Sequence, residues 1–321
     1  MIWNDMERLL SKIATLYYIE GKTQKEIAEQ LNLSPSKVFR ILNEAKTMGI
    51  VQISIKQPIV SCNSLELEFE RRFGLKEAII VNVEQEDKDN LLSLLGQAAC
   101  DYLKRIVTPA DIIGISWGQT LYEMVKQLQP FGVEGTKIVQ LVGGINNGQE
   151  NIEAVELAKR LSQVFNSSPV LFYCPAVVAN PEVKKGLLLD NNIKNVLEMS
   201  KNATIALVGI GTMEKESLLF KKGHLSSSWH SELLKRNAVG DVCMHFFKLD
   251  GTPCNEDLDD LIVGIELEDL KKIRTVICIA GGINKAEAIL GALKAKIPKV
   301  LVTDKMTAEK ILEIEAKGGG Q

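Results

Sequence analysis

The 321-residue sequence predicts an α/β protein with an N-terminal helix-turn-helix domain (residues 1–57) and a larger Rossmann-like, parallel-sheet domain (residues 58–321). Three observations predict this organisation. In the first sixty residues, apolar residues recur at helical spacing between capping residues. From residue 77 onward, short apolar runs alternate with helical segments. Several of these runs are continuously apolar, which is typical of strands buried on both faces of a parallel sheet.

The composition is that of an ordinary soluble globular protein, with 45% hydrophobic residues, 25% charged residues and a formal net charge of −3. This balance does not indicate nucleic-acid binding by the whole chain. Residues 1–57 carry eight Lys or Arg and six Asp or Glu, a net charge of +2. Any basic surface is therefore expected to be local and N-terminal.

The cysteines and the N-terminus indicate a reduced, cytoplasmic protein. Six cysteines are scattered without a C-x-x-C pair, and the chain has three histidines, so we expect buried thiols, no metal site and no cofactor. "MIWNDMERLL" is charged where a signal peptide would be apolar. No apolar run reaches about 18 residues, and no membrane span is expected.

Three helices are predicted in the first domain. Gly21 ends the first helix, and Thr23 with Glu26 forms a capping box at the start of the second. Ser34 caps a third helix of about residues 35–47, with Pro35 at its first position. This order and spacing predict a helix-turn-helix whose third helix is the recognition helix.

The outward face of the third helix is polar and cationic. It comprises Ser36, Lys37, Phe39, Arg40, Asn43 and Lys46. We expect Arg40 to contact a base. The DNA-binding residues predicted with it are Thr23, Gln24, Ser34, Ser36, Lys37 and Asn43, most of them near helix starts that suit phosphate contact. The alternative is a plain three-helix packing unit with a solvated face.

"IVQISIKQ" (50–57) alternates like a short strand or wing, and a linker with Pro58 follows. The strands expected in the large domain are residues 77–83, 111–116, 136–142, 170–175, 203–210, 241–247, 275–280 and 299–304.

Glycine-rich segments follow several of these strands. They are "GISWGQT" (114–120), "VGGINNG" (142–148), "GIGT" (209–212) and "GGINK" (281–285). Because ligands of open parallel sheets lie beyond the carboxyl ends of the strands, we expect these loops to form one anion-binding mouth. Glycine allows a ligand to approach the backbone and leaves N–H groups free to bind it.

The segment 114–118 also matches G-x-S-x-G, the nucleophile elbow of serine hydrolases. His224, His230 and His245 follow Ser116, with Asp190 or Asp241 between, so residue order does not exclude a hydrolase. A Walker loop is excluded because Gly114 and Gly118 are one residue too close and Gln119 replaces lysine. "VGIGTME" has only the first half of a dinucleotide fingerprint.

Two further strand ends carry charge. Asp241 follows a glycine before a strand and could accept hydrogen bonds from sugar hydroxyls, or it could be a turn residue. Asp304 and Lys305 lie at the end of the last strand, with Thr307 near a helix start. Lys305 could neutralise an anion, although an exposed lysine is the default.

The order of a helix-turn-helix, "GISWGQTL", "VQLVGG", "LVGIGT", "AVGDV", "GIELEDLKKI", "AGGINKAEAILGAL" and "VLVTDKMTA" resembles the SorC family of bacterial sugar-responsive transcriptional regulators. The resemblance covers nearly the whole chain. It implies a large domain similar to sugar-phosphate isomerases, which binds a phosphorylated sugar without turning it over. It also implies dimers or tetramers on operator DNA.

The resemblance places a set of residues around the effector, with the phosphate held by residues 116–120. They are Ser116, Gly118, Gln119, Thr120, Gly143, Gly144, Gly209, Gly211, Asp241, Gly282 and Lys285. The family's "VTDE" is here Val302-Thr303-Asp304-Lys305. A covalent imine would need a lysine at the mouth. Val142 cannot serve, which leaves Lys285 and Lys305.

The sequence therefore predicts a regulator, not an enzyme, that represses a carbohydrate-utilisation operon. It is expected to bind a palindromic operator as a homo-oligomer and to respond to a phosphorylated sugar. The alternative is a sugar-phosphate isomerase or serine hydrolase with an N-terminal DNA-binding appendage. A phosphotransfer-linked module is a third alternative, with no histidine in a recognisable setting to support it.

Overall fold

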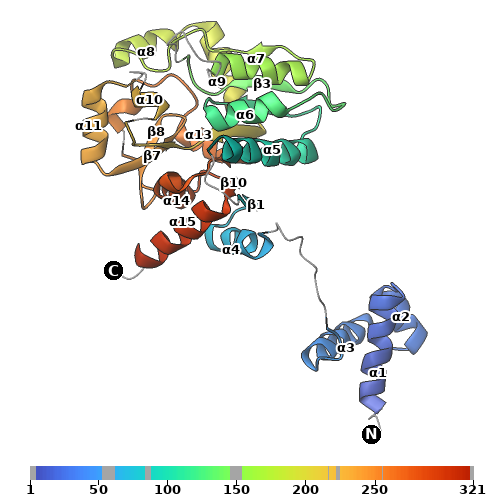
Figure 1. Ribbon diagram of the computed structural model, residues 1–321. Helices are drawn as coiled ribbons and strands as arrows, with labels where there is room; N and C mark the ends of the chain where they lie inside the picture. Colours follow the sequence, from blue (N-terminus) through green and yellow to red (C-terminus); the bar gives the residue numbers. More distant parts are fainter. Residues whose placement is uncertain are drawn as a thin grey trace. The chain divides into compact units, whose positions relative to one another are not determined.

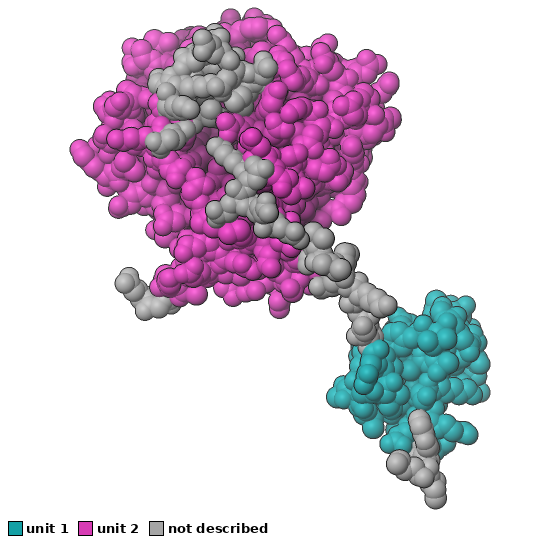
Figure 2. All heavy atoms as spheres, in the orientation of Figure 1, with its two compact units in different colours: residues 1–58 teal, residues 59–321 magenta. Residues whose placement is uncertain are grey.

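The computed structural model describes residues 5–52, 62–83, 88–144, 154–215, 217–221, 225–254 and 256–318. The chain divides into two compact units, Met1–Pro58 and Ile59–Gln321, coloured separately in Figure 2. None of the described helices is long and apolar enough to cross a membrane. All six cysteines are free and buried.

The first unit consists of three helices around one apolar core. α1 (Asp5–Ala14) runs into a π-helical turn (Thr15–Ile19), and α2 (Gln24–Leu31) and α3 (Pro35–Thr47) follow. The core includes Leu10, Ile13, Ile27, Val38 and Ile41, which come from all three helices. The strand expected at residues 50–57 is not present at 50–52, and residues 53–57 lie outside the described residues.

The second unit contains the predicted parallel sheet, with the strand order β1-β10-β9-β5-β2-β3-β4. Every neighbouring pair is parallel. The strands are β1 (Glu77–Val81), β2 (Ile112–Ile115), β3 (Lys137–Gln140), β4 (Pro169–Val170), β5 (Ile205–Gly209), β9 (Thr275–Ile279) and β10 (Val300–Asp304). Of the strand predicted at residues 170–175, only Val170 is in a strand, since β4 is the two-residue segment Pro169–Val170.

Helices cover both faces of this sheet (Figure 1). α5 (Lys88–Ile106), α6 (Gln119–Gln127) and α7 (Ala154–Val164) pack on the face that receives Ile113 and Ile115 of β2. The other face carries α4 (Asn63–Phe73), α9 (Asn191–Lys201), α14 (Ala286–Lys294) and α15 (Lys305–Gly318). Burial on both sides explains the continuous apolar runs. The shorter helices are α8 (Pro181–Leu187), α10 (Leu218–Lys221), α11 (Ser227–Lys235), α12 (Glu256–Asp259), α13 (Leu267–Lys272) and the 3-10 turn η2 (Ile283–Lys285).

A second, antiparallel sheet of order β6-β7-β8 corrects one expected strand. Residues 241–247 are not a single strand of the parallel sheet. β7 (Ala238–Val242) and β8 (His245–Lys248) form a hairpin, and β6 (Gly211–Thr212) pairs with β7. The chain reverses at Cys243 and Met244, whose φ angles of 52° and 67° are those of a tight hairpin turn.

Candidate functional site

The first candidate surface is the outward face of α3. Ser34 caps the helix by accepting a hydrogen bond from the N–H of Lys37, and Pro35 occupies the first position. Val38, Ile41, Leu42 and Ala45 are buried, which leaves the predicted DNA-contacting side chains on the exposed side. In the described part of the chain, no acidic side chain pairs with Lys37 or Arg40. Both cations are therefore available to a polyanion.

The predicted phosphate-contacting hydroxyls also have structural roles. The predicted capping box of α2 is present: Glu26 N–H donates to Thr23 Oγ1, and Thr23 N–H donates to the Glu26 carboxylate at 2.8 Å. Ser34 Oγ lies 3.1 Å from Ser36 Oγ. These contacts fix the start of each helix of the motif, where backbone N–H groups face outward.

The second candidate site lies where the strand order of the large sheet reverses. From β2 the chain continues outward to β3 and β4, whereas β5 returns to the other side of β2 and leads to β9. Ligands of such sheets bind in the crevice at this switch point, beyond the carboxyl ends of the strands. The segments after β2 and β5 approach each other there. A Cβ on Gly209 would lie 3.5 Å from the carbonyl oxygen of Trp117, and Ser116 N–H donates to Leu207 O at 3.1 Å.

Helix α6 begins at this switch point without a side-chain cap. Its N-cap is Gly118, with φ 138° and ψ 160°, a conformation essentially restricted to glycine. The N–H groups of Gln119 and Thr120 have no acceptor within the helix, because an α-helix leaves its first N–H groups unpaired. Ser116 and Thr120 are buried beside them, with 3% and 5% of their surface exposed. The arrangement offers N–H and hydroxyl donors to an anion.

A carboxyl group and an amine lie beside the segment that follows β5. β7 places Asp241 opposite Gly211, where a Cβ would lie 2.1 Å from the Asp241 carboxylate. Lys285 Nζ donates to the carbonyl oxygen of Ile210 at 2.8 Å. Burial raises the pKa of Asp241 to about 6, although the Met244 N–H and Lys285 oppose the shift. The pair brings an acceptor for hydroxyl groups and a cation together beside residues 210–211.

We expect the buried Asp241 to make stability depend on pH. Its pKa is about 6 in the folded chain and 3.8 when unperturbed, so the folded state holds the proton more tightly. Its stabilising contribution is complete below pH 3.8 and is lost as the pH rises through 6. Between pH 4.5 and 7.5, Asp241→Asn should therefore gain about 2 kcal/mol in free energy of unfolding relative to the parent chain. Urea unfolding at both pH values tests this, and parallel pH curves would contradict it.

Other predicted glycines do not offer free N–H groups, which corrects that expectation. Gly143 N–H donates to Val263 O and Gly144 N–H to Cys174 O, both at 2.8 Å. Gly282 N–H donates to Asp304 and Thr307. These N–H groups are hydrogen-bonded within the protein because neighbouring segments pack closely. A Cβ on Gly143, for example, would lie 2.6 Å from Pro175 O. The backbone N–H groups of these three glycines are therefore not available to a ligand.

The charged end of β10 is structural. The Asp304 carboxylate accepts hydrogen bonds from Thr307 and from Gly282 N–H, and so it fixes the loop after β9. Lys305, considered above as a neutralising cation, forms an exposed ion pair with Glu309 at 3.8 Å. Asp304 thus fixes the backbone at Gly282, and Lys305 remains exposed.

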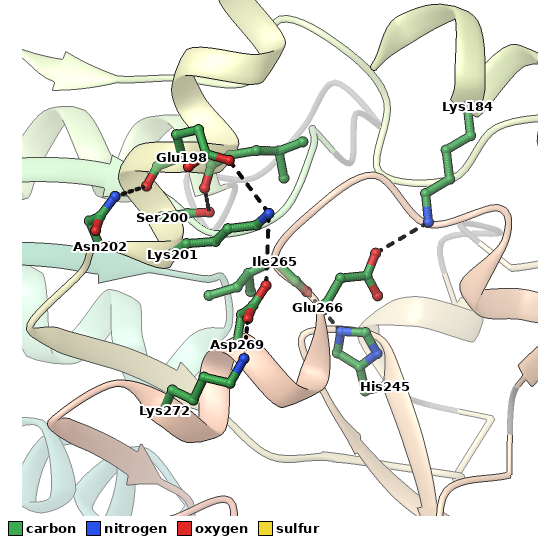
Figure 3. A network of polar contacts seen from close by, with 11 residues as sticks. Lys184, Glu198, Ser200, Lys201, Asn202, His245, Ile265, Glu266, Asp269 and Lys272 are labelled. Atoms are coloured by element: carbon green, nitrogen blue, oxygen red, sulfur yellow. Dashed lines mark hydrogen bonds and ion pairs between the residues drawn. The ribbon is translucent and has the colours of Figure 1, made fainter. Parts of the chain in front are cut away.

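The geometry does not support a nucleophile elbow at Ser116. The serine lacks the positive φ of a strained elbow, and its hydroxyl lies close to the thiol of Cys243, whose raised pKa it partly offsets. His230 Nε2 contacts Met213 O at 2.8 Å. His245 lies 3.0 Å from Asp259 and 2.9 Å from Ile265 O, within the network of Figure 3. His224 lies outside the described residues. No histidine of the described chain is bonded to Ser116.

His245 is better explained as a buried structural residue. Burial lowers its pKa, but hydrogen bonds to Asp259 and Ile265 outweigh that effect and raise the pKa above its ordinary value. Both ring nitrogens face acceptors, so both bonds are donated only by the protonated ring. Figure 3 shows Glu266 beside it, paired with Lys184 at 3.5 Å.

Cys243 lies close to the Ser116 hydroxyl and was not predicted from the sequence. The residue is 4% exposed and touches Ser116 from a turn more than a hundred residues away in sequence. Two-residue hairpin turns are usually predicted from pairs such as Asn-Gly, and Cys243-Met244 is not such a pair. The turn that positions Cys243 was therefore not recognisable from a local motif.

Both units of the chain match known protein families. The "Sugar-bind" sugar-binding domain family matches residues 57–313, and a winged helix-turn-helix DNA-binding family matches residues 20–52. The chain is 36% identical to the deoxyribonucleoside regulator of Bacillus subtilis over 96% of this chain and 98% of that protein. It is 30% identical to the sorbitol operon regulator of Klebsiella pneumoniae, over 97% and 99%.

A solved structure of a relative has a similar fold. The full-length sorbitol operon regulator SorC of Klebsiella pneumoniae has a TM-score of 0.74 and 29% identity, over 96% of this chain and 100% of that one. These relatives are named as regulators rather than enzymes, as the sequence predicted. The chain belongs to the SorC family of transcriptional regulators and is a DNA-binding regulator controlled by a sugar-related effector.

Proposed function

We propose that the effector is a phosphorylated sugar, bound at the mouth between β2 and β5, and that it controls the binding of α3 to an operator. The observation that carries this proposal is the uncapped start of α6. In α2, α3, α8, α9 and α11, a side chain accepts a hydrogen bond from the first turn. The starts of α4, α13 and α14 also lack such a cap, but their N-cap residues carry side chains and α6 begins at the switch point of the sheet. At α6 a glycine stands there instead, which leaves room and donors for a phosphate.

The remaining residues suit the sugar. Asp241 offers carboxylate oxygens to hydroxyl groups, and Lys285 adds a positive charge near Gly209 and Gly211. Close packing at Gly143 and the positive φ of Gly282 fix the backbone beside the proposed mouth. The deoxyribonucleoside and sorbitol named by two relatives favour a sugar or sugar alcohol of five or six carbons.

The DNA-binding residues of the proposal are those of α2 and α3. Arg40 contacts a base, and the helix starts at Thr23, Gln24, Ser34, Ser36 and Lys37 contact phosphates, with Asn43 further along the groove. The protein acts in the cytoplasm as a repressor. A dimer or tetramer with two-fold symmetry requires a palindromic operator.

A thermal-shift screen of sugar phosphates tests the effector class. A ligand at 100 times its Kd stabilises the folded chain by about 2.7 kcal/mol, which is a shift on the order of 5–10 °C. Each phosphate is compared with the same sugar without its phosphate, starting with pentose and hexitol pairs. A shift with the phosphate alone is the expected result. Equal shifts for both members of a pair would contradict the phosphate assignment.

A further inference from the structure

Phe39 is a large apolar side chain on the otherwise polar outward face of α3. It is 55% exposed, whereas Val38, Ile41 and Leu42 of the same helix are at most 3% exposed. It belongs neither to the buried core of this unit nor to the apolar residues that pack against that core. Within residues 5–52 it makes no ring contact. Folding of the first unit therefore does not require this aromatic ring.

The position of Phe39 on the helix places it among the residues proposed to contact DNA. Ser36 precedes it by three residues and Asn43 follows it by four, so the three side chains share one stripe, with Arg40 beside it. A recognition helix directs this stripe at base edges in the major groove. A solvent-exposed phenyl ring lacks hydrogen-bonding groups, so it reads no donor or acceptor there.

The 5-methyl group of thymine is the apolar feature that base pairs display in the major groove, and aromatic side chains contact it. We infer that Phe39 is a specificity-determining residue that packs against a thymine methyl group next to the base read by Arg40. This inference rests on the proposed binding of α3 to operator DNA. It adds an apolar base contact to the polar and charged ones.

The inference makes the phenyl ring and the methyl group interdependent. Removing one methyl group from the interface weakens binding about fourfold if it is buried by the ring. Once the ring is absent, removal of the methyl group should have no further effect. A double-mutant cycle between protein and DNA measures this coupling directly.

The experiment begins with selection of duplexes from a random DNA library by the full chain. In the selected duplex, each thymine is replaced in turn by deoxyuridine, which removes only the methyl group. Operator Kd is measured at one fixed salt concentration, because phosphate contacts make affinity depend on salt. The proteins are the parent chain, Phe39→Ala and the control Met48→Ala, whose side chain is 52% exposed at the end of α3.

The expected result is about a fourfold loss at one thymine of each half-site for the parent chain and for Met48→Ala, and none for Phe39→Ala. Selection with Phe39→Ala should also lose its preference for thymine there. Equal sensitivity of the parent chain and Phe39→Ala to deoxyuridine, or insensitivity of both, would overturn the inference. A changed oligomer mass in Phe39→Ala with retained sensitivity would assign the ring to a protein contact instead. If the parent chain selects no duplex, the proposed DNA binding itself fails.

Discussion

Replacing Gly118 with alanine is expected to weaken effector binding by roughly 5- to 150-fold while leaving operator affinity in the absence of effector unchanged. The residue has φ 138° and ψ 160°, and forcing a side chain into this region costs about 1–3 kcal/mol. No atom lies within 4 Å of the position of an added Cβ, so the methyl group meets no part of the protein. The expected loss arises because the N–H groups of Gln119 and Thr120 turn away from the phosphate. Titration calorimetry with the sugar phosphate found by thermal shift measures it.

Gly132→Ala is the matched control for this change. Gly132 also has a positive φ, 85°, and open space around an added Cβ, but it precedes β3, at the opposite end of the sheet from the mouth. Backbone strain should destabilise both variants, whereas effector affinity should fall in Gly118→Ala only.

Thr120→Val, which removes one buried hydroxyl, should also weaken effector binding. Wild-type affinity in both site variants would count against this pocket.

Replacing Arg40 with alanine should weaken operator binding by about 5- to 150-fold and relax the preference at one base position. An arginine that donates two hydrogen bonds to a base contributes about 1–3 kcal/mol of discrimination. Arg40 lies on the exposed face of α3, and no carboxylate of the described chain competes for it. Fluorescence anisotropy with the selected duplex and with duplexes changed at single positions gives both quantities.

Arg8→Ala controls for the loss of a positive charge from the same unit. Arg8 lies on α1, where it forms an exposed pair with Asp5 at 3.7 Å. Its removal should change operator affinity little and leave base preference intact. Unchanged affinity and unchanged preference in Arg40→Ala would show that the recognition helix was assigned wrongly.

Local chemistry explains which parts of the fold could be predicted. α3 was expected at about residues 35–47 and spans Pro35–Thr47, because Ser34 and Pro35 mark its start and its apolar residues keep helical spacing. The capping box at Thr23 and Glu26 was also predicted from spacing alone. The strands before the glycine loops were predicted because burial on both faces leaves continuous apolar runs.

Features that depend on distant segments were not predictable in the same way. The split of residues 241–247 into a hairpin depends on Cys243 and Met244 accepting positive φ, which their side chains do not favour. The N–H groups of Gly143 and Gly144 are bonded by residues 263 and 174, which no local motif links to them. Pairing of β6 with β7 brings Gly211 to Asp241 across thirty residues. Glycine loops at strand ends therefore indicate where a mouth lies, but not which donors remain free.

Mutual titration of the operator and the sugar phosphate tests whether effector binding at the mouth controls operator binding. Operator affinity of the full chain is measured with and without the sugar phosphate, and effector affinity with and without the selected duplex. For a repressor released by its effector, each ligand should weaken the other by the same factor, typically 5- to 150-fold. Gly118→Ala should shift the effector concentration required without changing the operator affinity of the free chain. Unchanged Kd values, with the two ligands binding independently, would contradict control of operator binding by the effector.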